Sequence, residues 1–330
     1  MTKLCRICGN AENNRVYKAR EMMFGTRDEF EYLECAGCGT VQICEIPDLS
    51  RYYPKDYYSL NADKNGVFEK RPRVRLAARF LGNYLLNRKN FVSQLFARKQ
   101  SWLDSFFPKY LKEPLLELNF RSRILDFGCG SGKLLQTLYY YGFRDLTGAD
   151  AFIEDDIFYP NGVKIYKLPL SEIEPFFDLV MLHHSFEHLP DPLESLQQIY
   201  KLLSPGKFCL IRIPLAAFAW EKYGVNWVQL DPPRHLFLFT EKSFRSLAET
   251  AGFAVAKVVY DSESFQFYGS ERYLQNIAMN EDKNSEGISS ESILTPENLR
   301  EWEREAEILN KQNKGDQACF YLQKPRDFKN

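Results

Sequence analysis

The stretch ILDFGCGSG, residues 124–132, decides the fold of this chain. An apolar run leads into a turn with glycine at every second position, and the helix-like KLLQTLYYYG of residues 133–142 follows. The three glycines of the turn are Gly128, Gly130 and Gly132. Glycine permits a sharp turn from strand to helix and lets a ligand approach bare backbone at the carboxyl end of a sheet. The stretch therefore predicts a ligand-binding turn.

Two acids accompany this turn. Asp126 precedes the first glycine by two residues, and Asp150 ends the next apolar run. A carboxylate at position 126 attracts a cationic ammonium and repels a pyrophosphate, and the dinucleotide fingerprint has two residues, not one, before its third glycine. A carboxylate at the end of the second strand can accept hydrogen bonds from ribose hydroxyls. The pattern indicates a ligand with a ribose and a positive charge.

Short apolar runs alternate with amphipathic segments from Arg121 onward, which is typical of a sheet with helices on both faces. The predicted strands are residues 121–128, 145–150, 162–168, 177–184, 206–214, 253–262 and 317–324. The predicted helices are residues 133–142, 192–203 and 241–252, the last capped by Thr240. We expect an α/β fold with a Rossmann-like sheet of seven strands. Two segments, near 215–238 and 265–315, are too long for ordinary loops and are candidate walls of an acceptor pocket.

The composition is that of an ordinary globular protein. The chain has 330 residues, of which 45% are hydrophobic and 26% charged. Its 43 Lys and Arg nearly balance 44 Asp and Glu, so the formal charge of -1 gives no support to general polyanion binding. No apolar run is long enough to cross a bilayer, and the first residues contain no apolar signal core. We predict a cytoplasmic protein of three parts, at residues 1–65, 66–120 and 121–330.

Four of the eight cysteines form two Cys-x-x-Cys pairs, each followed by glycine. The pairs are Cys5 with Cys8 and Cys35 with Cys38. In a reducing compartment such pairs are typical of zinc ligands, because each turn directs two thiolates at one tetrahedral ion. Four thiolates fill the coordination sphere, so we expect structural Zn²⁺ in a zinc-ribbon-like region over residues 1–65. Unmetallated buried thiols or a redox pair are the alternative, and Cys44 is expected to be a small core residue.

Residues 70–112 are strongly basic, with eleven Lys or Arg against one acid. Aromatic and aliphatic residues recur there at helical spacings, so we interpret the segment as basic amphipathic helices that connect the two main regions. Peripheral contact with the inner membrane surface and an electropositive mouth for a phosphate-bearing substrate are two other interpretations. The sequence does not decide among the three.

Four motifs in order resemble those of the class I S-adenosylmethionine-dependent methyltransferases. They are LDFGCGSG at 125–132, GAD at 148–150, FDLVMLHHSFEHLPDP at 177–192 and LLSPGKFCLIRIP at 202–214. The resemblance covers about residues 121–264 and implies a class I methyltransferase that uses S-adenosyl-L-methionine. The cysteine pairs, together with DPPRHLFLFT at 231–240 and GDQACFYL at 315–322, look like a bacterial subgroup that modifies sugars and surface glycans. That likeness implies a small-molecule or glycan acceptor.

The resemblance also implies roles for single residues. The three glycines of the turn would shape the methionine and ribose pocket, Asp126 would help to hold the methionine amine, and Asp150 would bind the ribose. The segment KLPLSEIEP at 167–175 lacks the acid that such proteins often place beside adenine. Leu168 is expected to supply an apolar wall there instead.

Methyl transfer to a hydroxyl is an in-line displacement that also needs a base for the hydroxyl proton. We favour His235 as that base, and His188 and Glu187 are the other candidates beside the expected methyl group. The resembling family keeps Glu-His at 187–188 across many acceptor types, which favours structural roles for that pair. His184, Glu187 and His188 could also hold a divalent ion if outside partners completed the site.

Other residues of the segment near 215–238 have two interpretations each. Arg234 either clamps an anionic group of the acceptor or pairs with an acid such as Asp231. The aromatic residues of the same segment either stack on a sugar ring or pack in the core. They are Trp220, Tyr223 and Trp227.

The sequence therefore predicts an S-adenosylmethionine-dependent methyltransferase that O-methylates a sugar, nucleotide-sugar or glycan hydroxyl. Another small molecule, or an RNA base recognised through the zinc region, is the alternative acceptor, although the overall charge balance disfavours nucleic acid. A nucleotide-dependent oxidoreductase is disfavoured by the glycine spacing, and a non-enzymatic zinc module by the intact glycine and acid motifs. The oligomeric state is left open.

Overall fold

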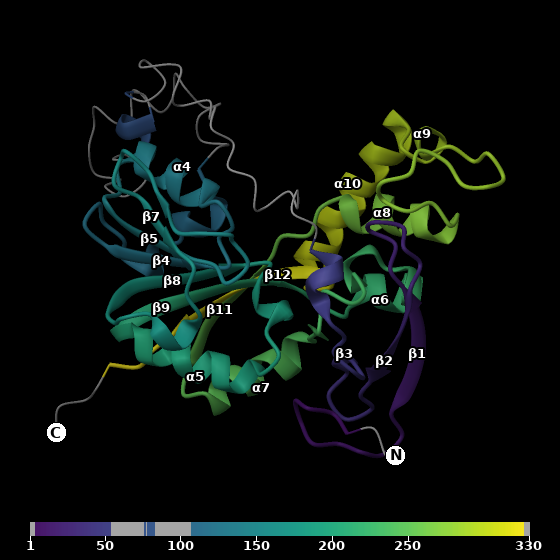
Figure 1. Cartoon of the computed structure of the whole chain (residues 1–330), viewed down its shortest axis with the longest axis horizontal. Coiled ribbons are helices and arrows are strands. Elements are labelled where there is room, and N and C mark those ends of the chain that lie inside the picture. The colour runs from purple at the N-terminus through teal and green to yellow at the C-terminus, as the bar shows by residue number, and fades with distance from the viewer. Residues whose placement is uncertain (1–3, 54–75, 77, 83–106, 327–330) are drawn as a thin grey trace.

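The computed structural model of the chain describes residues 4–53, 76, 78–82 and 107–326, and these residues contain two β-sheets (Figure 1). The smaller sheet is antiparallel. In sheet order its strands are β1 (Arg15–Arg20), β2 (Glu29–Glu34), β3 (Val41–Ile43) and β10 (Phe237–Leu238). The last of these strands comes from the predicted segment near 215–238, so that segment and the N-terminal region share one sheet.

The larger sheet carries the predicted α/β core. In sheet order its strands are β11 (Ala254–Tyr260), β12 (Gln317–Gln323), β9 (Leu203–Pro214), β8 (Phe177–His183), β4 (Arg123–Phe127), β5 (Asp145–Ala149), β7 (Lys164–Tyr166) and β6 (Ile157–Phe158). The strands from β9 to β7 run parallel, β12 is antiparallel to both of its neighbours, and β6 is antiparallel to β7. The seven predicted strands are confirmed, and β6 is an eighth that the sequence did not reveal.

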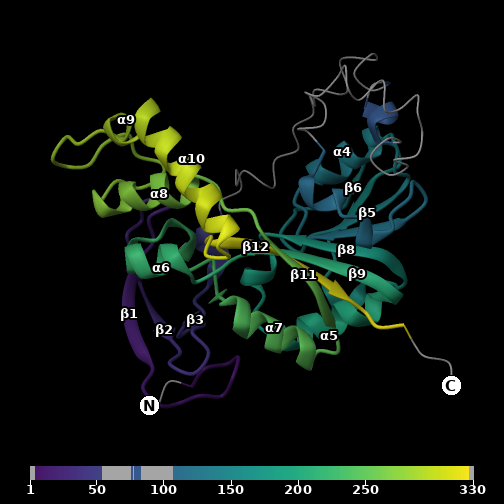
Figure 2. The same ribbon diagram turned by 180° about the vertical axis from the view of Figure 1, so that it is seen from behind.

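Helices cover both faces of the larger sheet (Figures 1 and 2). One face carries α4 (Lys133–Tyr141), and the opposite face carries α5 (Pro192–Leu202) and α7 (Glu241–Thr250). Successive residues of the central strand point to opposite faces, so Ile124 and Leu125 enter two different hydrophobic cores. The predicted cap of α7 is confirmed, because the Thr240 hydroxyl accepts the Ser243 N–H within a reciprocal capping box. The Rossmann-like α/β fold is therefore as predicted.

The two long segments form helices beside the smaller sheet (Figure 2). They contain α6 (Phe218–Tyr223), α8 (Phe265–Leu274), α9 (Ser290–Ile293) and α10 (Pro296–Lys311). The Trp220 indole edge-packs on Tyr17 and donates a hydrogen bond to Glu34 at 2.9 Å, which fixes α6 against β1 and β2. Trp220, Tyr223 and Trp227 are all buried in the main core. They pack in the protein interior, so the hypothesis that they stack on a sugar ring was wrong.

Single-turn 3₁₀ helices complete the described elements. They are η1 (Leu49–Tyr52), η2 (Lys109–Lys112), η3 (Pro114–Leu116), η4 (Leu170–Glu172), η5 (Phe186–His188), η6 (Gly224–Asn226) and η7 (Val228–Leu230). In the basic segment 70–112, the described residues 76 and 78–82 are helical, and residues 109–112 form η2. The rest of this segment lies outside the described residues, so its other predicted helices and its membrane contact remain predictions. None of the helices in the described ranges is both long and apolar enough to cross a membrane.

Candidate active site

The glycine turn joins the carboxyl end of β4 to the start of α4, as predicted. Gly128 and Gly132 have φ angles of 75° and 76°, in the left-handed region that side chains disfavour. A Cβ on Gly128 would lie 2.3 Å from the Cβ of Ser185, and one on Gly132 would lie 2.5 Å from Cδ1 of Ile165. Gly130 also has a positive φ, of 52°. Glycine is therefore required by backbone conformation and by space alike.

The two predicted acids lie beside this turn. Asp126 is buried, and burial together with the negative charge of Asp150 raises its pKa to about 8. Asp150 holds the turn, because its Oδ2 accepts the Gly130 N–H and its Oδ1 accepts the Phe152 N–H, both at 2.8 Å. Each carboxylate oxygen has a second lone pair, which leaves Asp150 able to accept ribose hydroxyls.

These residues fit the charged methyl donor that the sequence implied. An ammonium group placed beside Asp126 would stabilise the carboxylate that burial destabilises, whereas a pyrophosphate would add to the repulsion. Leu168 lies two residues after β7 and is half-buried. Its predicted contact with adenine remains a prediction.

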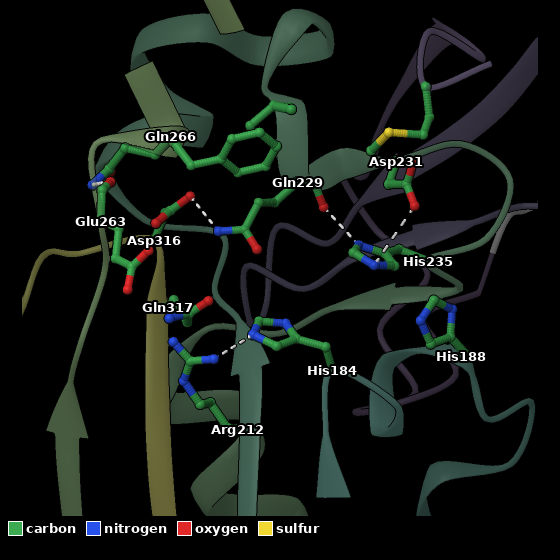
Figure 3. Close-up of a pocket in the computed structure, with 13 residues that line it drawn as sticks. His184, His188, Arg212, Gln229, Asp231, His235, Glu263, Gln266, Asp316 and Gln317 are labelled. Carbon is green, nitrogen blue, oxygen red and sulfur yellow. Dashed lines mark hydrogen bonds and ion pairs between the residues drawn. The ribbon is translucent and has the colours of Figure 1, made fainter. Parts of the chain in front are cut away.

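A cavity of about 330 Å³ lies at the carboxyl ends of β8 and β9 (Figure 3). Most of its lining residues have polar side chains, and they come from segments far apart in the sequence. The lining residues are Met23, His184, His188, Arg212, Val228, Gln229, Asp231, His235, Glu263, Phe265, Gln266, Asp316 and Gln317. Ser185, which limits the space at Gly128, follows directly after His184. The two predicted long segments supply walls of this cavity, as expected.

Two cavity histidines have their ring orientation fixed by backbone carbonyls. Nδ1 of His235 lies 2.7 Å from the Gln229 oxygen, and Nδ1 of His188 lies 2.8 Å from the Arg234 oxygen. A carbonyl oxygen only accepts hydrogen bonds, so each Nδ1 carries a proton, and Nε2 is the nitrogen that has a lone pair when the ring is neutral. The two histidines among the three predicted base candidates therefore place Nε2 where it can accept a proton.

His235 is the more buried of the two. Burial lowers its pKa to about 4, although the nearby Asp231 acts in the opposite direction. Its Nε2 lies 3.8 Å from a carboxylate oxygen of Asp231 and 3.8 Å from one of Glu187. The imidazole is therefore neutral at neutral pH, which is the form that can take a proton.

Glu187 lies behind the histidines and does not line the cavity. The Arg212 guanidinium donates to Nε2 of His184 at 2.8 Å, which places the His184 proton on Nδ1, 3.5 Å from Oε1 of Glu187. Burial opposes ionisation of Glu187, but His184 and the other histidines lower the pKa of this carboxyl overall. Glu187 is thus a buried carboxylate that orients histidines, which agrees with the structural role that was favoured for it.

A metal site is the other arrangement that these groups permit. Glu187, His188 and His235 each offer one ligand atom, and the three atoms lie within 4.8 Å of one another. The set of metal ligands predicted from the sequence contained His184 in place of His235. Nε2 of His184 accepts a hydrogen bond from Arg212 and is therefore not available to a metal ion. His183, the neighbouring histidine, is half-buried, packs against the ring of Tyr110 and does not line the cavity.

Arg234 is wholly buried in an ion cluster. Its guanidinium bonds to Glu21 at 3.0 Å and to Asp231 at 2.9 Å. The alternative in which Arg234 pairs with Asp231 is therefore confirmed, and the clamp on an anionic acceptor was wrong. Since Glu21 follows β1, this cluster fixes the segment that carries His235 to the N-terminal region.

The four predicted zinc ligands come together. Sγ of Cys5 lies 3.7 Å from that of Cys38, Sγ of Cys8 lies 3.5 Å from that of Cys35, and all four sulfurs lie within 4.8 Å of one another. Thiolates around a tetrahedral Zn²⁺ at about 2.3 Å are spaced on this scale. The four sulfurs could therefore hold one zinc ion.

Several cavity residues were missed in the sequence. Arg212 stands in the apolar strand β9, where a charged residue is itself a signal of function or pairing. Tyr53 does not line the cavity but was missed too: it stacks on Phe152 at 4.9 Å, and its hydroxyl lies 3.1 Å from Nδ1 of His188. It thereby joins the cofactor side to the cavity. Gln229, Gln266 and Asp316 carry no local signal, because distant segments bring them together.

Comparison with known proteins gives partial matches. A ubiquinone biosynthesis O-methyltransferase of Caulobacter sp. (strain K31) is 33% identical over 121 residues, which cover 32% of this chain and 47% of that protein. Another of the same name, from Psychrobacter arcticus, is 24% identical over 157 residues, covering 42% of this chain and 61% of that protein. The chain thus spans about half the length of these curated relatives.

Among solved structures, the cyclopropane synthase MmaA2 of Mycobacterium tuberculosis aligns with a TM-score of 0.42 and 15% identity, over 79% of this chain and 100% of that one. A SAM dependent methyltransferase from Archaeoglobus fulgidus aligns with a TM-score of 0.38 and 18% identity, over 70% and 94%. Residues 91–258 match the family described as "Methyltransferase domain", which is just over half of the chain. The predicted methyltransferase is thus confirmed at the level of the family: this chain belongs to the methyltransferase-domain family.

Proposed function

We propose that the protein is an S-adenosylmethionine-dependent methyltransferase that methylates a hydroxyl of a sugar, nucleotide-sugar or glycan. The observation that carries the proposal is the cavity at the carboxyl ends of β8 and β9, which has the imidazole rings of His188 and His235 and eight other polar side chains in its described lining. Bound S-adenosyl-L-methionine would supply an electrophilic methyl group on its sulfonium. The protein's task is then to hold the acceptor in line and to remove one proton.

The cofactor would be held at the glycine turn. Asp126 would bind the methionine ammonium, Asp150 the ribose hydroxyls, and Leu168 would face the adenine. Ser185 supports this placement, because it connects the turn at Gly128 to the first cavity residue, His184. A methyl group at the turn would therefore lie next to the cavity.

His235 would take the proton of the acceptor hydroxyl. Its neutral imidazole has the free nitrogen, and its donor nitrogen is held by Gln229 at 2.7 Å. His188 is the second group able to accept this proton, and Glu187 would stabilise the positive charge that develops on either ring. A positioned base of this kind contributes about 100-fold or more to the rate.

The acceptor class follows from the lining. The ends of side chains such as Arg212, Gln229 and Asp316 offer hydrogen bonds, and Met23, Val228 and Phe265 are the only apolar residues in the described lining. A compound with several hydroxyls satisfies such groups, whereas a long apolar tail would leave them without partners. The relatives named for ubiquinone biosynthesis support O-methylation of a small molecule, and the polar lining favours a sugar.

The zinc region would have a structural role. Four cysteine sulfurs leave no coordination position for water, and the sheet beside them contains β10, which begins two residues after His235. We propose that one Zn²⁺ at Cys5, Cys8, Cys35 and Cys38 stabilises this sheet in a cytoplasmic protein. Membrane contact through 70–112 remains a hypothesis.

The acceptor can be tested with S-adenosylmethionine carrying a tritiated methyl group. The purified protein is incubated with cell extract, and label is measured in sugar, glycan, lipid and RNA fractions. We expect label in the sugar or glycan fraction, and clearly less label with the Asp150→Asn variant at S-adenosylmethionine concentrations below saturation. Label that is confined to lipid, or that ribonuclease removes, would contradict the proposed acceptor class.

A further inference from the structure

One wall of the cavity contains two buried oxygen atoms that have no hydrogen-bond partner among the described residues. This wall consists of Glu263, Gln266 and Asp316, at the starts of α8 and β12, and it faces the histidines across the cavity (Figure 3). Gln266 and Asp316 are each 1% exposed. Burial of a polar oxygen without a partner costs free energy, so such atoms mark a place where a ligand supplies the missing donor.

Asp316 is held by one of its two oxygens. Its Oδ2 accepts the Trp227 indole N–H at 2.9 Å and the Gln229 amide at 2.6 Å. Its Oδ1 is buried and has no hydrogen-bond partner among the described residues. The two donors fix the carboxylate, so the partnerless oxygen is presented by a rigid group.

Gln266 shows the same arrangement. Its amide nitrogen donates to the Glu263 carbonyl at 3.3 Å, and that bond fixes which end of the amide is nitrogen, because a carbonyl only accepts. The remaining atom, Oε1, is buried and lacks a partner among the described residues. Two partnerless oxygens thus belong to one wall of one cavity.

The charges near the cavity are unbalanced in the same direction. Arg234 bonds to both Glu21 and Asp231, and Arg212 bonds to Asp261 at 2.6 Å. No Lys or Arg within the described part of the chain forms an ion pair with Asp316 or Glu263. Burial raises the pKa of the Asp316 carboxyl, so its carboxylate form lacks a cation that would stabilise it.

We propose that this wall binds an ammonium group, so that the acceptor is an amino-sugar or another hydroxyl compound that carries a primary amine. The inference rests on the proposed function and narrows its substrate class. An ammonium has three N–H donors and one positive charge. Asp316 Oδ1 and Gln266 Oε1 can take two of the donors, and Glu263 at the rim can take the third. A neutral sugar would satisfy the oxygens but leave the charge unbalanced.

The first arm of the test blocks amines in the acceptor. The sugar fraction of cell extract is treated with acetic anhydride in aqueous bicarbonate and then with hydroxylamine, which removes acetyl esters but leaves acetamides. Labelled S-adenosylmethionine and wild-type protein are then added. We expect the treated fraction to lose at least nine-tenths of the label that a mock-treated fraction receives. Full labelling after treatment would overturn the proposal.

The second arm changes the wall itself. Asp316→Asn keeps one oxygen for Trp227 and Gln229 but turns the partnerless oxygen into an N–H donor and removes the charge. We expect the acceptor KM to rise about tenfold or more, with the S-adenosylmethionine KM unchanged. Glu297→Gln, an exposed change on α10, is the matched control and should leave both constants unaltered. An unchanged acceptor KM in the Asp316→Asn variant would overturn the proposal.

Two results separate this inference from the proposed function. If untreated extract receives no label in any fraction, the proposed methyl transfer fails, whatever the nature of the wall. If label enters sugars that carry no amine, methyl transfer stands and the ammonium site is rejected. Should Asp316→Asn fail to fold, the amine-blocking arm decides alone, because it uses wild-type protein only.

Discussion

His235 would accept the proton of the acceptor hydroxyl on its Nε2 atom. Asn at position 235 can still donate to the Gln229 carbonyl in the manner of the imidazole Nδ1, but it has no basic nitrogen. We expect His235→Asn to reduce kcat about 100-fold or more while the affinity for S-adenosylhomocysteine stays unchanged. Steady-state kinetics and calorimetry give the two values.

His188→Asn is the matched variant, since it preserves the donation to the Arg234 carbonyl. We expect it to lower kcat less than His235→Asn does. If the His235 variant keeps full turnover and the His188 variant loses it, the roles of the two rings must be exchanged. If neither loses turnover, the proton leaves by a route that involves neither ring.

Asp126 couples cofactor binding to pH. Burial and the Asp150 charge raise its pKa to about 8 in the free protein, so the carboxyl is largely protonated at pH 7. An ammonium binds the carboxylate, and below pH 8 binding must therefore expel a proton. We expect the affinity for S-adenosylhomocysteine to rise with pH, by up to about tenfold per unit between pH 6.5 and 7.5, and to level off above pH 8. Calorimetry across this range measures it.

Asp126→Asn is the control for that pH dependence. The amide cannot titrate, so binding should be weaker and its slope between pH 6.5 and 7.5 should largely disappear. An equal slope in wild type and variant would assign the titration to the ligand or to another residue.

The buried ion cluster of Arg234, Glu21 and Asp231 holds the segment that carries His235 in place. Removal of the Arg234 side chain would leave Glu21 and Asp231 as buried carboxylates without their cation. We expect Arg234→Met to lower the free energy of unfolding by about 3–5 kcal/mol in urea titrations. Arg300→Met removes an exposed pair with Glu297 and should cost less than about 1 kcal/mol. Equal effects of the two changes would contradict the importance of the buried cluster.

The elements that the sequence predicted are those with a strong local pattern. Strands β4 and β8 are rich in apolar residues, with Ile124, Leu125 and Phe127 in β4 and the run LVML in β8, and the Thr240 cap marked the start of α7. The two-residue strands β6 and β10 are too short to show an alternation of apolar and polar residues. Strand β10 forms because it pairs with the edge of β3, which lies about 200 residues earlier in the chain. Strands that depend on a distant partner leave no local sign.

The candidate site divides in the same way. The cofactor turn and the zinc ligands are short motifs, so their residues could be named from spacing alone. The cavity wall of Gln266 and Asp316 requires α8 and β12 to meet, which depends on the packing of the whole C-terminal region. For Arg234 the sequence left two alternatives, and only the position of Glu21 decided between them.

Across the whole molecule, the zinc region and the cavity form one unit. The Thr240 hydroxyl donates to the Cys38 carbonyl at 2.9 Å, and the Tyr32 hydroxyl donates to the His235 carbonyl at 2.9 Å. Disorder at the cysteines would therefore reach the segment that carries His235. We expect Cys38→Ser to lose bound zinc and most of the turnover, as measured by metal analysis and kinetics.

Cys44→Ser is the matched control, because Cys44 is not one of the four clustered thiols. It should retain one zinc ion and near-normal turnover. A Cys38→Ser protein that lacks zinc but turns over normally would show that the two regions act independently.

The central claim is that the glycine turn, Asp126 and Asp150 form a site for a cationic methyl donor. Calorimetric titration of the purified protein with S-adenosylhomocysteine and, separately, with NAD tests it most directly. We predict binding of S-adenosylhomocysteine near one equivalent, at least tenfold weaker in Asp150→Asn, and no heat of binding with NAD. Binding of NAD with no binding of S-adenosylhomocysteine would contradict the claim.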